Sequence, residues 1–153
     1  MRRLTYALQF YRPAGAAPQP IVASGDCVVT ITPVCVTGEV GTLGQFQTAA
    51  VETHPTKPNP DGSFTETGVV TFGDPAGNNT LRFSSIHNGY MNAYACPEAP
   101  FTAGTVMWGV ESGEGFFAGA TGAITSNFLI DLTQPHGQDG VLIAYHFGVV
   151  YLP

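Results

Sequence analysis

One acidic residue of this chain, Glu66, lies in a sequence context that can tune its chemistry. In the stretch SFTETGVVTFG, residues 63–73, strand alternation puts Glu66 on the same face as Phe64, Val70 and Phe72. Burial among such side chains raises the pKa of a carboxyl group and lets it act as a general acid or base near neutral pH. The alternative is a solvated Glu66 near the end of a barrel, because unpaired carboxylates are rarely buried.

Aromatic, hydroxyl and imidazole side chains supply the other candidates for a site. Tyr145 joins Glu66 as a candidate catalytic residue. The candidate ligand-binding residues are Tyr6, Phe64, Phe83, His87, Trp108, Ser126 and Phe128. Trp108, the sole tryptophan, offers a flat wall for an unsaturated ligand, with simple core packing as the alternative. His87 follows a strand end, where loops build pocket rims, and plain exposure to solvent is its alternative.

No sequence pattern indicates a metal, a cofactor or a covalent nucleophile. The four histidines are dispersed, at His54, His87, His136 and His146. The serines lack a nucleophile-elbow sequence, and no CxxC occurs. The three cysteines are Cys27, Cys35 and Cys96, which leave one unpaired in any scheme. A bridge between Cys27 and Cys35 stays open, and we expect no cofactor and no metal site.

Charge and hydropathy exclude two classes of partner. The 153 residues include five basic and eleven acidic side chains, and the net charge is -6. No basic stripe exists to neutralise phosphates, so we do not expect nucleic-acid binding. The apolar stretches have the length of strands and are too short to span a bilayer. Thr5, Tyr6 and Gln9 interrupt any signal-peptide core, so we expect a cytoplasmic protein and leave secretion open.

The elements that would position these residues are strands. Charged residues make up only 10% of the chain, which has 19 glycines and 12 prolines, a composition typical of short strands joined by turns. The expected strands are residues 3–11, 21–32, 43–53, 63–73, 80–87, 104–112, 122–132 and 140–151. We predict one all-β domain, residues 1–153, folded as an eight-stranded antiparallel β-barrel with a central cavity. A two-sheet sandwich is the alternative.

The last expected strand, residues 140–151, is apolar on both faces. We take Tyr145 to share the interior face with Tyr6, which puts His146 on the opposite face, toward solvent or an interface. An apolar outer face is typical of a strand that another subunit covers. We therefore expect a homo-oligomer, either a dimer or a trimer.

A glycine-rich stretch, residues 113–125, reads GEGFFAGATGAIT. A dinucleotide-binding loop would leave a strand and open a helix, whereas the residues that follow, AITSNFLID, alternate as a strand does. Glycine permits a positive φ and close backbone approach, and an aromatic side chain between glycines can plug the end of a barrel. The stretch therefore predicts a corner between two strands.

The same stretch resembles the G-x-G-x-F-x-G-A-x-G motif of the allene oxide cyclase barrel family and, more loosely, the dirigent proteins that share this barrel. The matching positions are Gly113, Gly115, Phe117, Gly119, Ala120 and Gly122. Two further segments fit the family outline, TGVVTFGD-x(6)-LRFSS and the closing HFGVVYLP, so the resemblance spans residues 63–152. The family's catalytic acid lies in the N-terminal strand. Residues 3–11 contain no Asp or Glu, so the reaction of the plant cyclases is not expected here.

Together these features favour a cofactor-free cyclase or isomerase. Its barrel would fold an apolar, unsaturated small molecule into a reactive conformer with modest electrostatic help. Bacterial natural-product cyclases with similar barrels suggest a polyketide-like substrate by analogy. A lipophilic-ligand carrier and a dirigent-like guide for radicals are the alternatives. An ionisable residue deep among apolar ones favours the cyclase, and a wholly apolar lining favours the carrier.

Overall fold

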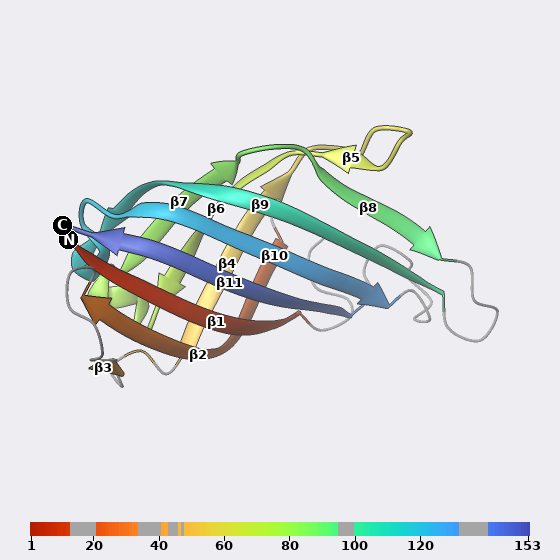
Figure 1. Ribbon diagram of the computed structural model, residues 1–153. Coiled ribbons are helices and arrows are strands. Elements are labelled where there is room, and N and C mark those ends of the chain that lie inside the picture. Colours follow the sequence, from red (N-terminus) through yellow and green to blue (C-terminus); the bar gives the residue numbers. More distant parts are fainter. Residues whose placement is uncertain (13–20, 34–40, 43–45, 47, 95–99, 132–140) are drawn as a thin grey trace.

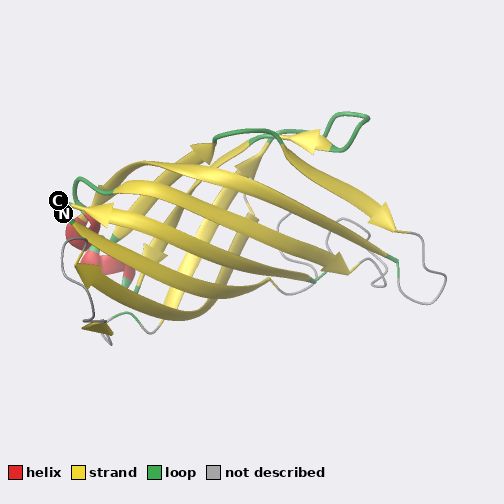
Figure 2. Ribbon diagram, viewed as in Figure 1, coloured by secondary structure: helices red, strands yellow, loops and turns green. Residues whose placement is uncertain are grey.

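Nearly all regular structure in the computed structural model is β-strand (Figures 1 and 2). The described residues are 1–12, 21–33, 41–42, 46, 48–94, 100–131 and 141–153. The strands are β1 (Arg2–Arg12), β2 (Ile21–Pro33), β3 (Gly41–Thr42), β4 (Thr48–Pro55), β5 (Ser63–Phe64), β6 (Glu66–Phe72), β7 (Thr80–Ser85), β8 (Gly89–Tyr94), β9 (Phe101–Glu114), β10 (Thr121–Asp131) and β11 (Leu142–Leu152). Two single-turn 3₁₀ helices are η1 (Pro75–Gly77) and η2 (Gly115–Phe117).

The strands form one strongly curled antiparallel sheet with the shape of a half-barrel. The order along the sheet is β10-β11-β1-β2-β4-β6-β7-β9-β8-β5, and β10 also pairs with β9. β1 pairs with β11 over its whole length, from Arg2 opposite Leu152 to Arg12 opposite Leu142. The first and last long strands of the chain are therefore neighbours in the sheet. Figure 1 shows β9, β10, β11, β1 and β2 across the front and β4, β6 and β7 crossing behind them.

The predicted all-β class is confirmed, and each expected strand region contains a strand in the described residues. Two strands were not expected: the two-residue β3, which pairs with β2, and β8. β8 arises from HNGYMNAY, whose Asn and Gly residues are typical of loops, and it pairs with β9. The expected strand 63–73 divides at Thr65, because β5 pairs with β8 while β6 pairs with β4 and β7. The expected strand 43–53 begins among residues outside the described ones and continues as β4.

The core lies on the concave side of the sheet. Alternate residues of β1 are buried, namely Leu4, Tyr6, Leu8 and Phe10. Facing strands contribute further buried side chains, including Phe72, Leu81, Phe83, Val106 and Trp108. The period-two burial is the consequence of successive side chains pointing to opposite faces of a strand. The four residues that alternation placed on one face of the stretch 63–73, Phe64, Glu66, Val70 and Phe72, are all buried.

The glycine-rich stretch folds as the predicted corner. A dinucleotide-binding loop leads into an α-helix, whereas this stretch leads into the strand β10. Gly115 and Gly119 have positive φ angles of 59° and 73°, which side chains with a Cβ rarely adopt. Phe117 between them is fully buried and packs on Phe72, with ring centroids 4.5 Å apart. The corner thus closes the core at the end where both chain termini lie (Figure 1).

Candidate functional site

Glu66 is the first residue of β6, and its backbone is held by a side chain of the neighbouring strand. The Glu66 N–H donates to the Ser85 Oγ at 2.8 Å, and the Ser85 hydroxyl donates to the Glu66 carbonyl oxygen at 3.1 Å. Ser85 ends β7, where the ladder with β6 stops at Thr67 opposite Ser84. One hydroxyl therefore satisfies both backbone groups of Glu66 and fixes the position from which its side chain starts.

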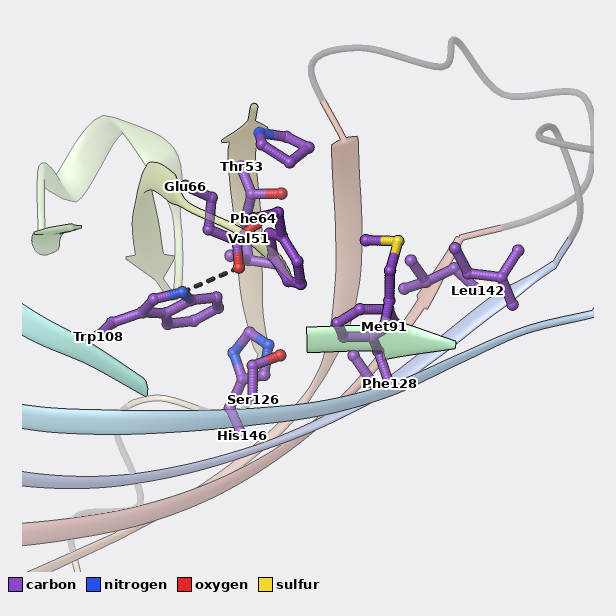
Figure 3. A pocket seen from close by; sticks show the side chains of 13 residues that line it. Val51, Thr53, Phe64, Glu66, Met91, Trp108, Ser126, Phe128, Leu142 and His146 are labelled. Atoms are coloured by element: carbon purple, nitrogen blue, oxygen red, sulfur yellow. Dashed lines mark hydrogen bonds between the residues drawn. The ribbon is translucent and has the colours of Figure 1, made fainter. Parts of the chain in front are cut away.

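The carboxyl group of Glu66 reaches into the core toward Trp108 on β9. The Trp108 indole Nε1–H donates a hydrogen bond of 2.9 Å to Glu66 Oε1 (Figure 3). Phe83 stacks on the same indole, with ring centroids 3.9 Å apart and an interplanar angle of 15°. Because the indole is packed on one face and fully buried, its N–H has a fixed direction. The structure thus orients one carboxylate oxygen through a rigid aromatic donor.

Burial dominates the electrostatics of Glu66. Glu66 is buried, with only 7% of its surface exposed to solvent. Loss of solvation raises the pKa of Glu66 from 4.5 to about 7, and the hydrogen bonds from Trp108 and Thr53 oppose that rise. The first of the two alternatives for Glu66, a carboxyl group among apolar side chains, is what the structure contains. A carboxyl group with a pKa near 7 exchanges protons at physiological pH.

Glu66 lies at the edge of a pocket on the concave side of the sheet (Figure 3). Its lining residues are Val51, Thr53, Pro55, Phe64, Glu66, Met91, Trp108, Ser126, Phe128, Ile130, Leu142, Ala144 and His146. The cavity measures about 60 Å³ and opens to solvent. Since one water needs roughly 10–15 Å³ by this measure, there is room for a group of several non-hydrogen atoms. The pocket suits an apolar guest with a few polar contacts.

A second titratable side chain lines this pocket. His146, on β11, is 2% exposed, and its ring packs against Phe10 and Trp108 with centroid distances of 4.4 and 4.7 Å. Burial lowers the pKa of His146 from 6.5 to about 3, so the imidazole is neutral near pH 7. Its Nδ1 has no hydrogen-bond partner among the described residues. His146 therefore places a neutral donor or acceptor next to the indole that contacts Glu66.

The structure gathers five of the nine predicted site residues in this pocket. They are Phe64, Glu66, Trp108, Ser126 and Phe128. Tyr6 and Phe83 are buried in the core but do not line the pocket: Tyr6 packs edge-on against Phe72. His87 is exposed, in agreement with its solvent alternative. The residues brought together come from β5, β6, β9 and β10, so the curl of the sheet assembles the site.

The predicted interior position of Tyr145 is wrong. Tyr145 is 47% exposed, and the buried residues of β11 are the even-numbered ones, such as Ala144 and His146. The register explains this, because Ala144 lies opposite Phe10 and His146 opposite Leu8, both of which are buried. The sequence of β11 is apolar on both faces, so alternation carried no contrast from which to choose a face.

The sequence analysis did not include His146, Thr53 or Met91 among the site residues. Because Tyr145 was placed on the interior face, its neighbour His146 was assigned to the outer face. Met91 comes from β8, a strand that was not expected. Leu8 and Phe10 already indicated the buried face of the first strand. Placing the even-numbered residues of the last strand on that face would have assigned His146 to the interior. No comparable signal pointed to Thr53 or Met91.

The described residues contain neither a metal-binding cluster nor a membrane-spanning helix. Among the residues that the structure describes, no three His, Cys, Asp or Glu side chains cluster as metal ligands would. Cys35, Cys96 and His136 lie outside the described residues. Within the described part of the chain, no helix has the length and apolar character needed to cross a membrane.

Comparison with known proteins adds no relative. No protein-family model, no curated protein and no solved structure matches this chain.

Proposed function

We propose that this protein is a cofactor-free isomerase or cyclase that acts on an apolar, unsaturated small molecule of the polyketide or natural-product type. One observation carries the proposal: Glu66 stands in an apolar pocket with a pKa of about 7 and an oriented carboxyl group. Strongly perturbed titratable groups in clefts are concentrated at functional sites. A wall of Trp108, Phe64 and Phe128 would hold an unsaturated carbon skeleton against that carboxyl group.

Proton transfer through Glu66 explains such a reaction without any further reagent. In its ionised form the carboxylate takes a proton from one carbon of the ligand, and the C–H electron pair moves into the unsaturated system. In its protonated form it returns the proton to another carbon of the same molecule, so that the double bond has moved and nothing is consumed. The hydrogen bond from Trp108 lowers the pKa of Glu66 and so favours the ionised form.

The same proposal includes the finer architecture. Eight strands, β10-β11-β1-β2-β4-β6-β7-β9, form a closed barrel of the allene oxide cyclase type around the pocket. The pairing of β10 with β11 on one side and with β9 on the other supports closure. The corner with Phe117 supports the proposal, because the matched Gly115, Gly119 and Gly122 have positive φ angles and a Cβ at Gly113 would collide with the backbone of Phe117. Closure would surround the ligand with strands and leave water access only through the mouth of the pocket.

A carrier that holds the ligand unchanged is the principal alternative to an enzyme. Most of the lining is apolar, which serves a carrier and an enzyme equally well. Glu66 and His146 favour an enzyme. Burying two titratable groups costs free energy, and holding an apolar ligand unchanged does not require them.

The test compares the ligand that co-purifies with the native protein and with Glu66→Gln. Each protein, with its extracted ligand added back, is incubated in deuterated buffer, and the ligand is then examined by mass spectrometry. We expect the native protein to incorporate deuterium or convert the ligand, and Glu66→Gln to do neither while still binding it. Glu52→Gln, which changes a half-exposed glutamate paired with His54, is the matched control and keeps the activity. An unchanged, undeuterated ligand from both proteins establishes the carrier.

A further inference from the structure

Ser126 and His146 form a second polar position in the pocket, distinct from Glu66. They lie directly opposite each other on β10 and β11, and both are almost fully buried. Figure 3 shows their side chains together on one wall, and the Trp108 indole beside them contacts both the His146 ring and the Glu66 carboxyl group. The pocket therefore presents Ser126 and His146 on one wall in addition to Glu66, in a lining that is mostly apolar.

The orientation of the imidazole is fixed by its aromatic neighbours. Trp108 meets the ring at an interplanar angle of 90°, and Phe10 packs on it at 49°. Neither contact satisfies a nitrogen, and Nδ1 is buried without a partner among the described residues. A buried polar group without a hydrogen bond costs free energy, which a ligand atom placed against it recovers. A core histidine retained only for packing would do better as phenylalanine.

We infer that the ligand carries a neutral oxygen, as a carbonyl or a hydroxyl, which pairs with His146 beside Ser126 while its unsaturated carbons lie against Trp108 and Glu66. The inference deepens the proposed function and rests on it. It makes His146 a ligand-binding residue and narrows the substrate class from apolar, unsaturated small molecules in general to ketones, enols and alcohols. In a proton transfer, an oxygen at this position also accepts the charge that develops when Glu66 removes a proton from a neighbouring carbon.

The charges of the site favour a neutral ligand over an ionised one. An anionic ligand would be repelled by the Glu66 carboxylate and would lose its hydration in the apolar lining. The imidazole does not compensate for that loss, because burial lowers the pKa of His146 to about 3 and leaves it uncharged. The polar contacts that the pocket offers, an imidazole nitrogen and the Ser126 hydroxyl, suit a neutral oxygen.

The experiment measures equilibrium binding, so it does not depend on turnover. Acetophenone, 1-phenylethanol and ethylbenzene, which have the same carbon skeleton, are titrated into the native protein and into His146→Phe. We expect the substitution to weaken acetophenone and 1-phenylethanol binding roughly three- to tenfold, as the loss of one hydrogen bond does. Ethylbenzene binding stays within about twofold. A loss confined to the alcohol also supports the inference and identifies Nδ1 as the acceptor.

A spectroscopic arm guards against a change in folding. The protein is labelled with ¹⁵N-histidine, and acetophenone is expected to shift the imidazole resonance of His146 whereas ethylbenzene is not. His146→Asn, whose amide lies near the position of Nδ1, restores part of the lost affinity, and His87→Gln, at an exposed histidine, changes nothing. Equal effects of His146→Phe on all three compounds, or no response of the histidine resonance to either acetophenone or 1-phenylethanol, overturn the inference. The binding experiment involves no turnover, so a failed deuteration test and a failed binding test are separate results.

Discussion

Glu66 and His146 respond to the same apolar surroundings in opposite directions. Burial disfavours the charged form of each, so it raises the pKa of the carboxyl group to about 7 and lowers that of the imidazole to about 3. Between these two values both side chains are uncharged, and a neutral ligand enters a pocket without a bare charge. Above about pH 7 Glu66 becomes a carboxylate base while His146 remains a neutral hydrogen-bonding group. Glu66 is therefore suited to proton transfer, and His146 is suited to binding a neutral ligand.

The raised pKa of Glu66 makes a definite prediction for stability. Native Glu66 keeps its proton up to about pH 7, whereas in the unfolded chain it loses the proton near 4.5. The native state thus binds more protons in this window, and the free energy of unfolding falls as the pH rises through it. The difference between 4.5 and 7 corresponds to about 3 kcal/mol. Urea denaturation of the native protein and of Glu66→Gln should show their stability difference shifting by about 3 kcal/mol in favour of the variant between pH 4.5 and 8.

His146 is the other titratable side chain that lines the pocket in the described part of the chain, and it is present in both proteins. Its lowered pKa makes both proteins lose stability as the pH falls from 6.5 toward 3, because the unfolded chain then binds the additional proton. That effect largely cancels when the two proteins are compared. A stability difference that is constant from pH 4.5 to 8 would contradict a raised pKa for Glu66.

At the scale of the elements, contrast between the two faces of a strand decides what could be predicted from the sequence. In β6 and the residues before it, Thr65, Thr67 and Thr71 alternate with apolar residues, and the buried position of Glu66 followed from that pattern. In β11 both faces are apolar, so the position of His146 could not be read from alternation. Register against β1 settles it, and register depends on contacts between distant segments. The corner was predictable because its glycines report backbone geometry directly.

The corner between β9 and β10 is expected to contribute stability through Phe117. Its ring is fully buried and contacts Phe46, Phe72 and Phe116. Replacing it with alanine removes this packing at the closed end of the core, away from the pocket, so Phe117→Ala should cost about 3–5 kcal/mol of unfolding free energy in urea titrations. Phe116→Ala, at a partly buried neighbour, should cost less. Similar costs for the two variants would show that Phe117 does not anchor the corner.

At the scale of the whole molecule, the curled sheet separates an inner surface, which carries the site, from an outer surface with an apolar patch. We call this patch the outer apolar face. It consists of Met107 on β9, Leu129 on β10, and Tyr145, Phe147 and Val149 on β11, each 38–54% exposed. In the register Thr125 of β10 lies between Met107 and Phe147, while Tyr145, Phe147 and Val149 are alternate residues on one face of β11. Monomeric proteins seldom expose large continuous apolar patches.

We propose that a second copy of the chain covers the outer apolar face, in a dimer or a trimer. The two sides of such an interface are apolar, while each copy carries a net charge of -6 that opposes association at low ionic strength. Screening of that repulsion should therefore make the oligomer more stable as salt is added. Light scattering coupled to size-exclusion chromatography, over a range of concentrations and salt, measures the distribution of species.

Phe147→Lys tests this interface, because Phe147 is 54% exposed and central in β11. Burial of a lysine against a second apolar surface is unfavourable, so the variant should be monomeric where the native protein is oligomeric. Its lower negative charge would by itself favour association, so a loss of the oligomer cannot be an effect of net charge. Tyr90→Lys on β8, outside the outer apolar face and 51% exposed, makes the same kind of change and should leave the oligomer intact. A native protein that is monomeric throughout, or equal effects of the two substitutions, would exclude the interface on β9, β10 and β11.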